Sequence, residues 1–174
     1  GARPIQPDDI AILFRSRAGH RYYEDALDAR GIRTYVYKGL GFFDAPEVQD
    51  LQALLRYLAR PESNLRAAAL LRSRLIRLSD PALNALAPGL AEALRSPAFD
   101  VAGAGLGDMD RALLTRARED VARWLGAADR VAPAELVDRI LEDTAYAYEL
   151  RGPRLAQARE NVKKVRALIR RVQR

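Results

Sequence analysis

The chain has 174 residues, 49% of them apolar, with a formal net charge of +6 and a pI near 10.0. This composition indicates a globular chain rather than a disordered one. The absence of cysteine excludes disulfides and thiolate metal sites, and a single histidine excludes a multi-histidine metal site. No apolar run approaches the roughly 20 residues of a membrane span, so we expect a cytoplasmic protein without a membrane segment.

The first 40 residues predict a parallel strand–helix–strand unit. A short apolar run at 10–14 is bounded by polar residues, as is typical of a strand buried on both faces. A helix pattern with Tyr23 and Leu27 follows, and a second strand is predicted at 34–37. Arg15 would then stand at the carboxyl end of the first strand, where ligands bind in open α/β sheets.

A helix is predicted after the glycine-containing turn at 39–41. Asp44 would cap it, Pro46 would occupy its first turn, and Glu47 would close a capping box. Its buried face would comprise Val48, Leu51, Leu54, Leu55 and Leu58, which are spaced three and four apart.

From Ser63 onward the sequence predicts helices alone: 64–72, a short one from Ser79, a long one capped by Asp108, one opened by Pro133, and a last one after Pro153. The expected core residues of the last three include Met109, Leu113, Ala117, Val121, Trp124, Leu136, Ile140, Leu141, Tyr148, Leu155, Ala158, Val162, Val165, Leu168 or Ile169, and Val172, with Tyr146 also packed. We therefore expect an α/β piece at 1–60 and an all-helical region at 61–174, mostly α overall.

The positive charge is concentrated at the end of the chain. Residues 151–174 contain nine basic residues and one acidic residue, a net charge of +8, so the remainder nets −2. Arg159, Lys163, Arg166 and Arg170 follow at intervals of four, three and four, which aligns them on one helix face. Such a face suits DNA phosphates irrespective of base sequence. It equally suits a surface that rests on acidic protein.

Five pieces of sequence also occur in a distinctive order: AILFRSR at 11–17, YEDAL at 23–27, GI at 31–32, YKGLGFF at 37–43 and EVQDL at 47–51. Together they resemble motif IV and the following motif of the UvrD/Rep/RecB-type superfamily 1 DNA helicases. Arg17 stands where many UvrD-like members have asparagine, which makes the chain more similar to the RecB/AddA helicase–nuclease branch. The strong resemblance covers about the first third of the chain, and a fainter one continues beyond it.

The resemblance implies that residues 1–60 are half of a RecA-like, P-loop-type motor domain, the second one (2A), and that 61–174 are part of its helical 2B insertion. The sequence has no phosphate loop and no strand ending in an Asp-Glu pair; in the family both belong to the first motor domain. We therefore expect a fragment that binds neither ATP nor magnesium and is inactive alone. The full-length helicase would use both. Its partners would be the missing motor domain, single- and double-stranded DNA, and a nuclease or another protein of the same complex.

The resemblance also implies roles for individual residues. Arg15 would be the catalytic arginine finger that contacts the ATP γ-phosphate, since a guanidinium fork matches phosphate oxygens; the alternative is a surface pair with Glu24. Arg17, Lys38, Gly41 and Phe42 would contact DNA through charge, open backbone and base stacking. Alternatively Arg17 is solvated, and Phe42 or Phe43 packs beneath the next helix.

Two other functions remain open on the residues alone. The chain could be a non-catalytic helical adaptor that binds nucleic acid or protein through its basic last helix. It could also be a small nucleotide-binding α/β domain unrelated to helicases.

Overall fold

A computed structural model describes residues 3–15, 19–32, 34 and 42–172. Within these ranges the regular structure is helical and no β-strand is present. The expected parallel strand–helix–strand half of a RecA-like domain is therefore wrong for the described chain, whereas the expectation of a mostly α protein is confirmed. Residues 35–37 of the second predicted strand lie outside the described residues.

The first predicted strand shows why the α/β prediction failed. Residues 10–14 are extended but pair with no strand in the described chain, and Leu13 is 94% exposed and Ile10 64% exposed. A strand needs a neighbour that accepts and donates its backbone hydrogen bonds. The apolar pattern records only that these side chains suit a buried environment; it carries no information on the partner strand.

Eight α-helices and three short 3-10 helices make up the regular structure of the described residues. In chain order these are η1 (Pro7–Asp9), α1 (His20–Asp28), η2 (Phe42–Asp44), α2 (Pro46–Ala59), α3 (Asn64–Arg72), α4 (Asp80–Leu86), α5 (Leu90–Arg95), α6 (Asp108–Ala128), α7 (Pro133–Asp143), η3 (Tyr146–Glu149) and α8 (Leu155–Val172).

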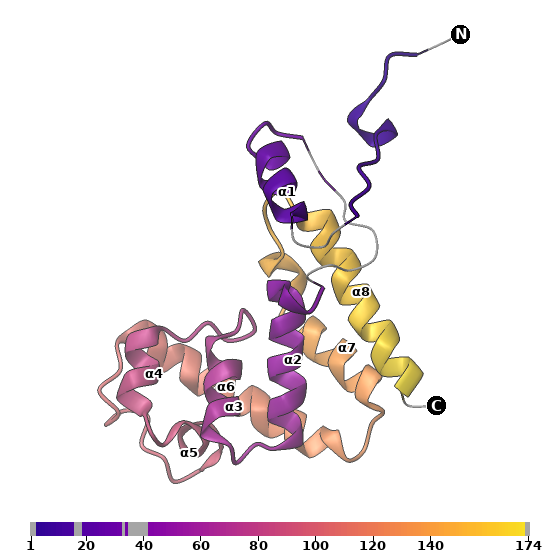
Figure 1. Ribbon diagram of the computed structural model, residues 1–174. Helices are drawn as coiled ribbons and strands as arrows, with labels where there is room; N and C mark the ends of the chain where they lie inside the picture. The colour runs from indigo at the N-terminus through magenta and orange to yellow at the C-terminus, as the bar shows by residue number, and fades with distance from the viewer. Residues whose placement is uncertain (1–2, 16–18, 33, 35–41, 173–174) are drawn as a thin grey trace.

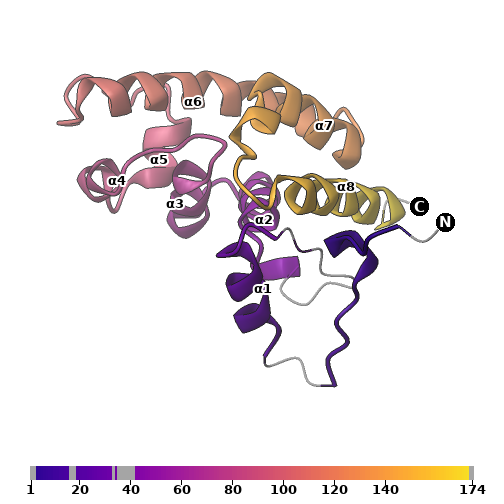
Figure 2. The ribbon, with the colours of Figure 1, turned by 90° about the horizontal axis from the view of Figure 1, so that it is seen from above.

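Helix α2 lies in the middle of the helical body (Figure 1). It packs against α3 on one side and α8 on the other. Helices α3, α4 and α5 pack together, α6 lies against α5, and α7 continues from α6 to lie against α8 (Figure 2). The segment before α1 extends away from this body in both views.

Two hydrophobic clusters share α2. The first joins its C-terminal half, with Leu54 and Tyr57, to α3–α6 and to Ile140 of α7. The second joins its N-terminal half to α7, η3 and α8; its buried members are Val48, Leu51, Val137, Tyr146, Leu150, Val162 and Val165. Successive turns of one helix thus bury side chains in two different clusters, because α2 presents apolar residues over much of its circumference.

Several predicted helix details differ in the structure. Ala45, not Asp44, is the N-cap residue of α2, and Pro46 is its first residue as predicted. The capping box is also absent, because the Glu47 side chain turns inward to Asn161. Of the expected α2 core, Leu55 and Leu58 are only partly buried, and Tyr57 is fully buried.

The later helices shift the buried face slightly. In α6 the buried residues are Leu114, Ala117, Val121 and Trp124, whereas Met109 is 75% exposed. The helix opened by Pro133 ends at Asp143, because Ala145 adopts a left-handed conformation with φ 50°. That turn buries Tyr146 and leaves Tyr148 exposed, so the core placement of Tyr148 and of the exposed Val172 was wrong. Across the described residues, no helix has the length and apolar character of a membrane span.

Candidate functional site

The basic face of α8 is the candidate nucleic-acid interface; it consists of Arg159, Lys163, Arg166 and Arg170. Helix α8 buries Asn161, Val162 and Val165, and its basic residues lie at the spacing that puts them on one side of the helix. Arg159, Lys163 and Arg170 are exposed, and Arg166 is half-buried.

Asp138 of α7 holds two of these four cations. Its Oδ1 accepts a hydrogen bond from Arg166 Nε, and its Oδ2 accepts one from Arg170 Nη2 at 2.8 Å. The Arg166 guanidinium, with Arg170 adding to its effect, lowers the pKa of the Asp138 carboxyl below its usual value. Asp138 therefore carries its full negative charge at neutral pH.

The other two cations are less constrained. Lys163 Nζ lies 2.6 Å from Glu160 Oε1 in an exposed pair within α8. Arg159 makes no ion pair within the part of the chain that the structure describes. Exposed pairs one turn apart on a helix contribute about 0.3–0.5 kcal/mol. A DNA phosphate could therefore displace Glu160 from Lys163 at little cost.

Arg15 lies at the end of the extended N-terminal segment and is exposed. No ion pair joins it to Glu24, although both residues are described, so the surface pair that was the alternative for Arg15 is absent. The acidic side of α1 instead faces Arg154, whose Nε lies 3.1 Å from Asp28 Oδ2 and whose Nη2 lies 3.3 Å from Asp25 Oδ1. These contacts join α1 to the turn before α8.

The two phenylalanines of η2 differ in their surroundings. Phe42 is partly buried against the second hydrophobic cluster, and its ring meets that of Phe43 edge-on at 5.1 Å between centroids. Phe43 is 63% exposed. Phe42 thus packs, as its alternative had it, while Phe43 presents the open ring. Arg17, Lys38 and Gly41, the other predicted DNA contacts of this region, lie outside the described residues.

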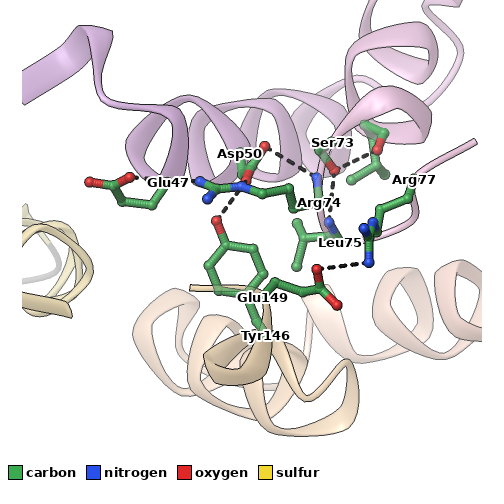
Figure 3. A network of polar contacts seen from close by, with 9 residues as sticks. Glu47, Asp50, Ser73, Arg74, Leu75, Arg77, Tyr146 and Glu149 are labelled. Atoms are coloured by element: carbon green, nitrogen blue, oxygen red, sulfur yellow. Dashed lines mark hydrogen bonds and ion pairs between the residues drawn. The ribbon is translucent and has the colours of Figure 1, made fainter. Parts of the chain in front are cut away.

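A buried polar network beneath these surfaces joins α2 to later parts of the chain (Figure 3). Asp50 Oδ2 accepts hydrogen bonds from Arg74 Nε at 2.7 Å and from Tyr146 Oη at 2.6 Å. Arg74 Nη2 lies 3.7 Å from Glu47 Oε2, and Glu47 Oε1 accepts a hydrogen bond from Asn161 Nδ2 at 2.7 Å. Two carboxylates of α2 therefore fix the segment after α3, η3 and α8.

The network is shielded from solvent. Glu47, Asp50 and Asn161 are each less than 10% exposed, and Tyr146 is 1% exposed. Burial, followed by the hydrogen bond to the Asp50 carboxylate, raises the pKa of the Tyr146 hydroxyl above its usual value. Tyr146 therefore remains a neutral donor. Alongside, Arg77 Nη1 lies 2.9 Å from Glu149 Oε2, a second link between the segment after α3 and η3.

Sequence reasoning missed this network and Asp138. The pattern held a signal for the network, because Glu47 and Asp50 share the helix face of Leu51 and Leu54 and so had to be buried with partners. Nothing comparable singles out Asp138, whose role depends on how α7 docks against α8. The described residues contain no group of three or more side chains that could hold a metal ion. Their chemistry is non-covalent binding of anions.

Comparison with known proteins gives the class of the chain. A family profile for the UvrD-like helicase C-terminal domain matches residues 3–94, from the extended entry through most of α5. The chain therefore belongs to the UvrD-like helicase C-terminal domain family, as the resemblance in residues 11–51 predicted.

Individual relatives extend the similarity into α8. The chain is 30% identical over 146 residues to the AddA-type subunit of an ATP-dependent helicase/nuclease from Desulforamulus reducens, covering 83% of this chain. It is 31% identical over 166 residues to the corresponding protein of Heliobacterium modesticaldum, covering 87% of this chain. The chain spans 12% of the length of each of these relatives. Both relatives are of the AddA type, which confirms the branch that Arg17 indicated.

Proposed function

We propose that this chain is a segment of an ATP-dependent DNA helicase of the AddA-like helicase–nuclease type, acting in DNA unwinding, repair or recombination. The carrying observation is its membership of the UvrD-like helicase C-terminal domain family, together with ATP-dependent helicase/nuclease relatives that match more than four-fifths of the chain. This membership favours the helicase over the non-catalytic adaptor and over an unrelated nucleotide-binding domain.

In this proposal the segment contributes to two sites of the longer protein. Arg15, exposed and unpaired within the described residues, serves as the arginine that reaches the ATP γ-phosphate, which is bound with magnesium by the other motor domain. An always-charged guanidinium stabilises the charge that spreads over the transferring phosphoryl oxygens. The basic face of α8 contacts the DNA backbone, Arg17, Lys38, Gly41 and Phe42 remain candidate DNA contacts, and the division near residue 60 remains a prediction.

The test is the DNA-stimulated ATPase of the full-length protein with Arg15→Ala. Loss of an arginine finger should lower turnover by a factor of about 10³ or more, while DNA affinity without nucleotide should barely change. Arg30→Ala is the matched control, because Arg30 is an exposed arginine of the same region that donates to its own helix at Ala26 O. Turnover that survives Arg15→Ala, or falls equally with Arg30→Ala, contradicts the assignment.

A further inference from the structure

The structure places an acidic side chain on the DNA-facing surface that we have proposed. We infer that Asp138 is an internal competitor of DNA phosphate, which occupies two of the four cations of the α8 basic face and so limits its grip on DNA. This inference rests on the proposed function, and it adds a regulatory residue that the sequence pattern did not reveal.

The geometry of the contact is that of a phosphate clamp. Each carboxylate oxygen of Asp138 takes one arginine: Oδ1 that of Arg166 and Oδ2 that of Arg170, the latter at 2.8 Å. The Asp138 side chain is 22% exposed, compared with 36% for Arg166 and 59% for Arg170. A guanidinium recognises carboxylate and phosphate in the same way, through parallel hydrogen bonds to charged oxygens. The two arginines are thus already arranged around an oxyanion.

The remaining charges make Asp138 the decisive competitor. Arg159 has no ion-pair partner among the residues described, and Lys163 has only Glu160 within the same helix. Both cations are open to phosphate, whereas Arg166 and Arg170 must first be released from a carboxylate supplied by another helix. The basic face therefore offers two open cations in its first half and two occupied ones in its second half.

The spacing suits a duplex once the clamp is open. From Arg159 to Arg170 the helix rises about 16 Å at 1.5 Å per residue. A DNA strand has a phosphate every 3.4 Å or so along the axis, so four cations over that length can each reach a different phosphate.

Opening the clamp does not require the two helices to separate. Val137 of α7 packs in the same hydrophobic cluster as Val162 and Val165 of α8. These apolar contacts are independent of Asp138, so a variant without the carboxylate should keep its fold. The free arginines would then face solvent or DNA.

The experiment compares Asp138→Asn with Asp120→Asn in the 174-residue chain. Asp120 on α6 also lies between two arginines, with Arg116 Nε at 3.7 Å and Arg123 in a closer contact, and its side chain is 13% exposed. The two substitutions change the net charge equally and each releases two arginines, but α6 packs against α5 and α7. Binding of a fluorescent duplex is titrated with salt, and circular dichroism checks the fold.

We expect Asp138→Asn to steepen the plot of log affinity against log salt from about −2 to between −3 and −4, because each added phosphate contact contributes about −0.9. A fourfold rise in salt should then cost the variant about tenfold more affinity than it costs the parent. Asp120→Asn should leave the slope unchanged. Adding Arg166→Gln and Arg170→Gln to Asp138→Asn should return the slope to that of the parent.

A slope for Asp138→Asn equal to that for Asp120→Asn overturns the inference, whether or not the parent binds DNA. A separate variant tests the proposed DNA contact itself: Arg159, Lys163, Arg166 and Arg170 are changed together to Gln. If that variant keeps the slope of the parent, the basic face does not contact DNA. If it flattens the slope while the two Asp variants coincide, only the role of Asp138 is wrong.

Discussion

Asp50 carries more of the fold than any charged residue that the sequence pattern singled out. It is 9% exposed and binds both a guanidinium and a tyrosine hydroxyl from segments far along the chain. A buried carboxylate is tolerable only when such partners replace the water that it has lost. The partners of Asp50 thereby fix where η3 and the segment after α3 must lie.

Removal of the Tyr146 hydroxyl should destabilise the protein. Tyr146→Phe keeps the ring in its cluster but takes a donor from the Asp50 carboxylate, so the free energy of unfolding should fall by about 2 kcal/mol, as for a hydrogen bond to a charged group. Tyr148→Phe is the control, because Tyr148 is 76% exposed. Urea unfolding measures both. Equal stability of the two variants would show that the hydroxyl contributes nothing.

Alkaline pH should destabilise the fold through the same class of residue. Burial raises the pKa of Tyr57 to about 12, with Arg95 opposing part of the rise, and burial also raises the pKa of Tyr146. In the unfolded chain both ionise near pH 10. Between about pH 10 and 12 the folded state therefore retains protons that the unfolded state has lost, and stability falls by about 1.4 kcal/mol per pH unit for each tyrosine.

This pH dependence has a direct check. Unfolding free energies measured from about pH 9 to 11.5 should be unaffected by these two groups below pH 10 and should decline above it. Tyr57→Phe should remove one proton's share of the decline, and Tyr148→Phe should remove none. A decline of the same steepness in Tyr57→Phe and the parent would contradict the assignment.

The elements themselves were more predictable than their ends. The α2 prediction placed Pro46, Val48, Leu51 and Leu54 correctly, because apolar spacing and a proline in the first turn are local signals. The capping prediction failed at Glu47, because a distant partner on α8 outweighed the local backbone contact. Helix α5 was not predicted at all, since its six residues lie between two Pro-containing breaks and are too short for a periodic pattern.

The start of α4 depends on a residue of α6. Ser79 Oγ accepts a hydrogen bond from Ala82 N at 3.2 Å, while Asp110 accepts hydrogen bonds from Ser79 N at 2.9 Å and from Ser79 Oγ at 2.7 Å. Asp110→Ala would leave the Ser79 backbone donor without its partner. We expect a loss of about 1–2 kcal/mol in unfolding free energy.

The control for that substitution comes from the same turn of α6. Asp108→Ala changes the same charge near the same helix N-terminus, but its side chain is 98% exposed and pairs only with Arg111 one turn on. Denaturant unfolding should separate the two variants by about 1 kcal/mol. Comparable losses would mean that the helix dipole, and not the contact with Ser79, accounts for the effect.

Across the whole molecule, the sequence predicted the helical character of 61–172 but not how the parts join. The helices follow from local periodicity, whereas strand pairing at 10–14 and the docking of α8 on α2 depend on residues far apart in the chain. The same limit applies to the candidate site. The four basic residues of α8 were found from their spacing, but the carboxylate that occupies two of them comes from another helix.

The two hydrophobic clusters predict which parts of the chain are needed for folding. Both are built from residues 42–169, and the described N-terminal segment adds surface contacts such as the Arg154 pairs with Asp25 and Asp28. Exposed pairs contribute about 0–1 kcal/mol each. A chain that starts at Phe42 should therefore unfold in one cooperative transition within about 1–2 kcal/mol of the parent.

A chain that ends at Leu150 should behave differently. It lacks α8, so Val48, Leu51 and Tyr146 lose the cover of Val162 and Val165, and Glu47 loses Asn161 as a buried partner. Each fully buried valine accounts for about 1.5–3 kcal/mol, and domains are stable by only about 5–15 kcal/mol. Hydrogen exchange should show early opening of α2, α7 and η3 in this chain, while the chain from Phe42 keeps them protected. Equal protection in the two truncated chains would mean that α8 is not part of the folded unit, and the second cluster would lose its place in the core.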